Sequence, residues 1–284
     1  MILYTNCNVY GRPDIKSILC NNGKIIQLLP SNNINAGKKI NLNGGWVYPG
    51  FTDSHMHLTG LGFSLESIDL VGETSKEEAL QKITEEIKNV PKGTWIIGRG
   101  WDQNKWKGKS YPTAKDLDLI SNEHPMVFRR IDGHAIWTNT IAMDIAKIDD
   151  KTEEVNGGII LRDSSNIPSG IFIDNALELI ENHIPQKSKS DIHRQILKAQ
   201  KLLNKFGITS IHDAGTSKQE IEVLKKMLKN DELSIRVFTM INNDPKEYDS
   251  FLKTGPEKDN PFIKIQAIKI YLDDVKYYTL PNNA

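Results

Sequence analysis

The second half of the chain carries the pattern that most restricts its fold, because strand and helix signals alternate there without hairpin turns. Residues 208–211 and 235–240 have the apolar, β-branched composition of strands, and residues 217–230 between them have helical spacing. Another strand is predicted over residues 262–272. Parallel strands need crossover connections, which helices usually supply. The sequence therefore predicts parallel βα units and an α/β fold.

Two further helices and a hairpin are predicted before this region. Ser75 and Glu78 have the spacing of a capping box at the start of a helix over residues 75–90. A second helix is predicted over residues 188–206. Its apolar face consists of Ile192, Ile196, Ala199, Leu203 and Phe206. Residues 157–161 and 170–173 flank a polar turn and predict a hairpin.

The N-terminal residues predict a small β-sheet unit. Strand-like runs at residues 2–4, 17–19 and 24–29 are separated by Asn- and Gly-containing turns. A unit of this size is too short to fold well alone.

A His-x-His pair follows the next apolar segment. Residues 46–53 predict a buried-type strand, and His55 and His57 come directly after it. Strand side chains alternate with a period of two, so both imidazoles are expected on the same side. If that side is the inside of a barrel, the two nitrogens converge, and imidazole suits zinc and similar divalent metals. The alternative is a pair of exposed histidines, or a structural pair in a β/α binding module.

Composition excludes several classes of partner. The 284 residues contain 36 Lys plus Arg and 36 Asp plus Glu, so the net charge is zero. Neither nucleic acid nor an anionic membrane is therefore expected as a partner. No apolar run approaches the roughly 18 residues of a membrane span, and the first residues lack the pattern of a secretory signal. The two cysteines, Cys7 and Cys20, are expected as free thiols of a cytoplasmic protein.

Several segments together resemble a known family. Residues 23–25, 42–44 and 47–57 resemble the signature of the amidohydrolase superfamily. Residues 98–102 and 130–137 are similar to its N-substituted formamide deformylase-like branch, also called the amidohydrolase 3 group. Asn139, Gly157-Gly158 and Pro168-Ser-Gly170 extend this similarity. The resemblance covers the chain to about residue 273.

The resemblance implies a metal-dependent hydrolase with a (β/α)₈ TIM-like barrel, of which only about the first half is present. The site of such a barrel lies at the carboxyl ends of its strands. The implied organisation is an N-terminal part of a composite β-sandwich (1–46), barrel strand one with the metal motif (47–71), a long inserted subdomain (72–205) and barrel strands two to four (206–284).

The resemblance also implies one or two divalent metal ions, most simply zinc, held by His55, His57 and Lys269. Many family members carry a carboxylated lysine on strand four, and Lys269 occupies the similar position. A lysine must lose its proton before it reacts with carbon dioxide, and burial beside cations favours that loss. The alternative is a strand lysine that faces solvent or forms an ion pair.

Other residues are expected around the ligands. Their implied roles are substrate binding for Arg99, Trp101, Asp102, Asp132 and His134, and support of the ligands without metal contact for Asp53, His212 and Asp213. The alternatives are packing of the inserted subdomain for the Arg-Gly-Trp-Asp segment and backbone hydrogen bonds for the loop around Asp132. His124, His183 and His193 are expected at the surface.

The implied activity is hydrolysis of non-peptide carbon–nitrogen bonds in a small amide-like substrate. The family's remaining metal-binding histidines and its general-base aspartate are expected beyond residue 284. The alternative is therefore a truncated, catalytically incomplete chain with partial metal binding. Such a chain would require a complementary C-terminal fragment or a homo-oligomer.

Overall fold

Four parallel strands form the central sheet, which positions the candidate site. The computed structural model describes residues 1–31 and 37–270. Across the sheet the order is β16 (Ile263–Ile268), β15 (Arg236–Ile241), β14 (Ile208–Thr216) and β7 (Phe51–Met56). All neighbouring pairs are parallel, so the strands end at one common edge, here called the carboxyl edge. The predicted α/β fold is confirmed, and the part of the fourth strand predicted past Ile270 lies outside the described residues.

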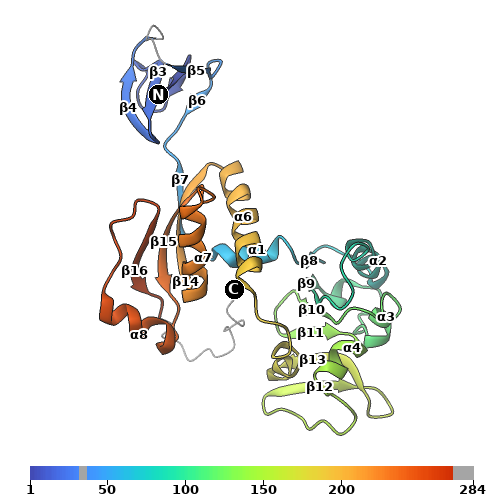
Figure 1. Ribbon diagram of the computed structural model, residues 1–284. Coiled ribbons are helices and arrows are strands. Elements are labelled where there is room, and N and C mark those ends of the chain that lie inside the picture. The colour runs from blue at the N-terminus through green and yellow to red at the C-terminus, as the bar shows by residue number, and fades with distance from the viewer. Residues whose placement is uncertain (32–36, 271–284) are drawn as a thin grey trace.

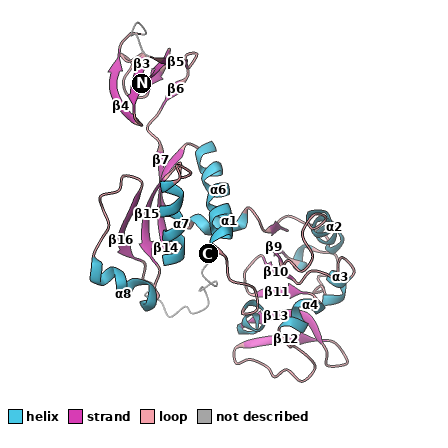
Figure 2. Cartoon of the chain, viewed as in Figure 1, coloured by secondary structure: helices cyan, strands magenta, loops and turns pink. Residues whose placement is uncertain are grey.

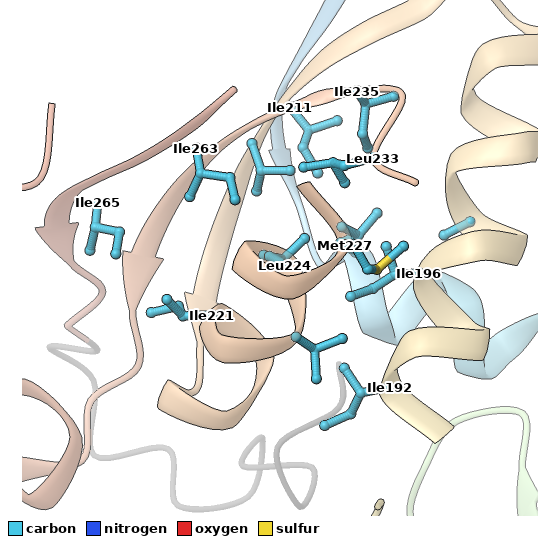
Figure 3. Packing of buried hydrophobic residues seen from close by; sticks show 14 of the residues in the cluster. Ile192, Ile196, Ile211, Ile221, Leu224, Met227, Leu233, Ile235, Ile263 and Ile265 are labelled. Carbon is cyan, nitrogen blue, oxygen red and sulfur yellow. The ribbon is translucent and has the colours of Figure 1, made fainter. Parts of the chain in front are cut away.

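Helices cover one face of this sheet. The main contacts come from α6 (Lys189–Lys205) and α7 (Lys218–Lys229), and α1 (Leu58–Ser64) and α8 (Pro245–Thr254) accompany them. Figure 3 shows the resulting core, in which aliphatic side chains from the two long helices meet those from the strands.

The predicted apolar face of α6 is confirmed at four of its five positions. Ile192, Ile196, Ala199 and Leu203 are buried in the core. Phe206 is instead 63% exposed, because the helix has ended by this residue, which is its C-cap. The 3.6-residue period applies only while the helix continues.

The first strand differs from its prediction. Trp46–Val47 forms a separate short strand, β6, which pairs with β2 (Asn8–Val9). The sheet strand β7 begins only at Phe51, after Pro49 and Gly50. A Cβ at position 50 would lie 2.0 Å from Thr209 Oγ1, so the Thr209 side chain of β14 approaches too closely for a residue with a side chain at this position. The predicted single strand is therefore two, and His55 belongs to the second.

A third group of elements lies between β7 and α6 in the sequence (Figure 1). Its six-stranded sheet has the order β12 (Gly158–Arg162), β13 (Pro168–Asp174), β11 (Ala135–Thr138), β10 (Met126–Arg130), β9 (Ile96–Trp101) and β8 (Ile68–Asp69). The β12–β13 hairpin confirms the prediction. The helices of this group are α2 (Lys76–Glu86), α3 (Ala114–Asp118), α4 (Thr140–Ile145) and α5 (Glu178–Glu181).

Helix α2 starts as predicted and ends earlier. The Ser75 side chain accepts a hydrogen bond from Glu78 N. The Glu78 carboxylate accepts hydrogen bonds from Thr74 N and Thr74 Oγ1, whereas a capping box would pair it with the backbone N–H of Ser75. The helix ends at Glu86, four residues before the predicted end.

The N-terminal strands also form as predicted. The sheet order is β4 (Lys24–Leu29), β3 (Ser17–Asn21), β1 (Ile2–Thr5) and β5 (Lys38–Asn41), around a small core of Leu3, Leu19 and Leu29. Cys7 and Cys20 are free thiols. In the described part of the chain, every helix is too short or too polar to cross a membrane.

Helix α1 is fixed against α6, which matters because α1 begins at His57. Glu66, just after α1, binds Arg194 at 2.7 Å and Lys198 at 3.1 Å. Figure 2 shows α1 and α6 side by side next to the central strands, and the two helices have many residues in contact. A Cβ at Gly62 would lie 2.2 Å from the Gln195 carbonyl oxygen. The absence of a side chain at Gly62 therefore permits this packing.

We predict that Gly62→Ala destabilises the protein by about 1–3 kcal/mol through overpacking. In an unconstrained helix the same change stabilises by about 1 kcal/mol, so the sign of the effect is diagnostic. Urea unfolding measures it. The control is Gly37→Ala, whose Cβ would lie 3.9 Å from its nearest neighbour, Met1 O. A Gly62→Ala variant as stable as the wild type would contradict this packing.

Candidate metal centre

The His-x-His pair lies at the carboxyl edge, where β7 passes into α1. His55 is in β7, and His57 is the N-cap residue of α1. Their ring centroids are 5.8 Å apart in an edge-to-face arrangement. His55 is exposed and His57 half-buried. The Asp53 carboxylate accepts a hydrogen bond from His55 N at 3.0 Å, which restrains the backbone that carries the first imidazole.

Lys269 lies at the same edge, directly after β16. Its backbone N–H donates to Ile241 O at 2.8 Å, so the ladder with β15 continues to this residue. Burial, and then the positive charges of His55 and Lys269, lower the pKa of His57, while Glu220 opposes this effect. His57 is therefore held in the neutral form, which is the form that binds metals. The charge of Lys269, which follows the last strand of the sheet, thus acts on His57, which follows the first.

Two carboxylates hold the turn that carries His57. Asp213, on β14, is buried and accepts a hydrogen bond from Leu58 N at 3.1 Å. Glu220, on α7, accepts a hydrogen bond from the Thr59 hydroxyl. Leu58 and Thr59 are the first two residues of α1, where backbone N–H groups lack helical partners. The orientation of the second histidine therefore depends on side chains more than 150 residues away in sequence.

Asp213 and His212 face opposite sides of β14. Asp213 is 4% exposed and lies beneath the α1 turn. His212 is half-buried and stacks on Phe238 of β15, with ring centroids 5.2 Å apart. Neighbouring strand residues alternate in direction, so only one of the pair can support the α1 turn.

The residues predicted to bind substrate lie in the third group of elements. Asp132 forms an ion pair with Arg130 at 2.9 Å, and Asp102 faces the same guanidinium at 3.9 Å. His134 Nδ1 lies 2.9 Å from Asp174 Oδ1. The contacts of these side chains stay within this group, whereas His55, His57 and Lys269 belong to the central sheet.

Arg99 and Trp101 lie on one strand in very different surroundings. Arg99 is exposed on β9. Trp101 is fully buried among Trp106, Trp137 and Phe128, and its indole N–H donates to Phe128 O at 2.7 Å. Its contacts are those of a core residue. His124, expected at the surface, is also buried, and its Nδ1 lies 3.1 Å from Thr94 O.

The sequence prediction missed two residues of these clusters. Glu220 has a visible signal, since Ser217-x-x-Glu220 directly after a strand is a capping box. Arg130 has none for its contact with Asp102, which approaches it only through the pairing of β9 with β10, whereas Asp132 is a local partner two residues away.

Few side chains in the described part of the chain are grouped so that they could bind a metal ion. Within residues 1–31 and 37–270, no three His, Cys, Asp or Glu side chains are arranged to hold an ion. The donor set at the carboxyl edge is instead two imidazoles and the Lys269 amine. Imidazoles suit zinc, and a carboxylated lysine would supply oxygen ligands.

Comparison with known proteins identifies the lineage. The profile described as the amidohydrolase family matches residues 38–279. The chain belongs to the amidohydrolase family. The protein YtcJ of Bacillus subtilis (strain 168) is 30% identical over 241 residues, covering 83% of this chain and 45% of YtcJ. The N-substituted formamide deformylase of Arthrobacter pascens is 26% identical over 193 residues, covering 66% of this chain and 36% of the deformylase.

A solved structure shares the fold of this family member. An uncharacterized metal-dependent hydrolase from Pyrococcus horikoshii OT3 matches with a TM-score of 0.73 and 24% identity. The match covers 94% of this chain and 53% of the hydrolase. The chain thus spans less than half the length of the two curated relatives above and about half of this structure.

We predict a pH-dependent effect of Asp213→Asn on stability. Burial, together with the Glu220 charge, raises the pKa of Asp213 from 3.8 to about 7. Between pH 4 and 7 the folded state keeps a proton that the unfolded state has released, so this group stabilises less as pH rises. Asparagine does not titrate and can still accept the Leu58 N–H bond. The free energy of unfolding of Asp213→Asn relative to wild type should therefore increase across this window, by at most about 4 kcal/mol.

Urea unfolding at intervals from pH 4 to 8 measures the effect of Asp213→Asn. Glu222→Gln removes an exposed carboxylate from α7 and serves as the control, with little change expected. If the free energies of unfolding of Asp213→Asn and the wild type differed by the same amount at every pH from 4 to 7, this would contradict the raised pKa of Asp213.

Proposed function

We propose that this chain provides the N-terminal part of a metal-dependent hydrolase that cleaves non-peptide carbon–nitrogen bonds in small amide-like substrates. The observation that carries the proposal is the position of His55, His57 and Lys269 at one edge of a parallel sheet. In open and closed parallel α/β folds, ligands bind at this edge. Membership of the amidohydrolase family and the similarity to a formamide deformylase support this class of substrate.

The proposed fold of the whole enzyme is a (β/α)₈ barrel. Strands β7, β14, β15 and β16 would be its first four strands, since they are parallel, consecutive across the sheet and covered by helices on one face. Residues 72–205 would be an insertion between strands one and two, and residues 1–46 a share of a composite β-sandwich. Residues 47–71 and 206–284 would then supply the barrel.

His55, His57 and Lys269 would hold a divalent metal, with zinc favoured by the imidazole ligands. Such an ion polarises a carbonyl and lowers the pKa of water to about 7. The chain's own contribution is to keep His57 neutral, to fix the turn after it through Asp213, and to restrain the His55 backbone through Asp53. Lys269, close to the imidazoles, is the residue proposed to be carboxylated.

The third group of elements would bind the rest of the substrate. Asp102, Asp132 and His134 follow strands β9 and β10 and gather around Arg130 and Asp174. Charged groups held by one another keep defined positions at low entropic cost, which suits recognition of a polar substrate. Arg99 is exposed and available to the same role.

Metal binding by histidine variants tests the proposal. We expect the purified chain to bind Co²⁺ or Zn²⁺, and His57→Ala to weaken that binding by at least about 100-fold, because one of few ligands is lost. Isothermal titration calorimetry and metal analysis measure it. His212→Ala is the matched control, since His212 lies on the neighbouring strand and stacks on Phe238 instead.

Two outcomes of this experiment would contradict the proposal. Absence of metal binding by the wild type would contradict the proposed metal centre. An equal loss of metal affinity in His57→Ala and in His212→Ala would show that the His-x-His pair is not the metal-binding site. Assays with N-formyl and N-acyl amines then separate an active hydrolase from a chain that binds metal without turnover.

A further inference from the structure

Helix α1 begins differently from most of the described helices. In α2, α4, α6 and α7 the N-cap side chain accepts a backbone N–H of its own helix; these residues are Ser75, Asn139, Ser188 and Ser217. His57 occupies this position in α1, and among the described residues its side chain makes no capping hydrogen bond. The first turn of α1 also contains no acidic residue. The helix is held instead by carboxylates from other elements, which leaves the imidazole available for another role.

Glu220 does more than cap its own helix. One carboxylate oxygen accepts hydrogen bonds from Ser217 N at 2.7 Å and from Ser217 Oγ at 2.8 Å. The other oxygen accepts the Thr59 hydroxyl, from a residue 161 positions earlier. The comparable carboxylate of α6, Asp191, uses its second oxygen locally, on Arg194 of the same helix. The bond of Glu220 to Thr59 is therefore not a requirement of helix capping.

Thr59 is well placed to transmit this restraint. It is 7% exposed and lies two residues after His57, in the first turn of α1. Leu58, which lies between His57 and Thr59, donates its backbone N–H to the Asp213 carboxylate. Restraints at two consecutive residues leave the His57 backbone little freedom, because the turn is already fixed on its other side by β7. The Glu220 carboxylate is also close enough to His57 to favour its charged form, which partly offsets the effect of burial on its pKa.

We propose that Glu220 is a positioning residue for His57, acting through Thr59. Its carboxylate, oriented by Ser217, fixes the first turn of α1 and so aims the imidazole at the candidate metal centre. This inference rests on the proposed metal-binding function of the site. Groups that orient metal ligands in this indirect way typically change metal affinity 10–100-fold when they are removed.

The test removes the bond without disturbing the cap of α7. Thr59→Val deletes the hydroxyl and keeps the β-branched shape, and Thr59→Ser restores the hydroxyl. Cobalt titration, followed by absorbance, should show about 10-fold weaker binding in Thr59→Val and near wild-type binding in Thr59→Ser. Glu220→Gln is a second route to the same loss, because only the amide oxygen of glutamine accepts hydrogen bonds, so the donors of Ser217 and Thr59 can no longer both be satisfied.

Two control variants separate positioning from general stability. Thr84→Val removes a hydroxyl that donates to Leu80 O within α2, a helix well separated from α1 in Figure 1. Asp116→Asn weakens the capping box of α3, which lies in the third group of elements. Both should lower stability slightly and leave cobalt affinity unchanged. In metal-free protein, NMR relaxation of the His57 ring should show greater mobility in Thr59→Val, a change that loss of stability elsewhere does not produce.

The outcomes distinguish this inference from the proposed function. If His57→Ala abolishes cobalt binding while Thr59→Val and Glu220→Gln bind as the wild type does, the positioning role is overturned and the metal centre stands. If the wild type binds no cobalt, the proposed function fails and the inference fails with it. Weaker binding in Thr59→Val that Thr59→Ser restores supports the inference.

Discussion

The hydrogen bonds from the first turn of α1 to Asp213 and Glu220 connect the candidate site to the rest of the structure. A helix start needs acceptors for its free N–H groups, and most helices take them from their own N-cap. Here a histidine occupies the N-cap. The buried Asp213 carboxylate of β14 accepts the Leu58 N–H, and the half-buried Glu220 carboxylate of α7 accepts the Thr59 hydroxyl. The position of His57 is therefore coupled to the core between the central sheet and its helices.

This arrangement carries a cost in stability. Asp213 is buried close to Glu220, so its charged form is disfavoured near neutral pH. Thr216 and Thr239 extend the polar network beneath the turn, and their hydroxyl groups are hydrogen-bonded to each other. Buried polar groups are tolerated when they are satisfied, and such networks are costly to disrupt. A site that depends on this network gains a fixed geometry at the expense of stability at higher pH.

The fold was predicted well where regular periodicity dominates. The last three strands of the central sheet, helix α6 and the β12–β13 hairpin all follow local patterns of apolar residues. The predictions were wrong at the ends of elements. The strand before His55 is interrupted where Gly50 meets the Thr209 side chain, a contact with no local sequence signal. Phe206 leaves the apolar face because α6 ends one residue before it.

The sequence by itself determined the family, the parallel βα order and the His55–His57 pair, because these depend on residue type and short-range spacing. Only the tertiary structure decided that Lys269 acts on His57 and that Asp213 and Glu220 hold the α1 turn. It also placed Arg130 between Asp102 and Asp132, and Trp101 in a core. The physical reason is that hydrogen bonds and charge interactions act over a few ångströms, and the groups that approach so closely are chosen by strand order and helix packing.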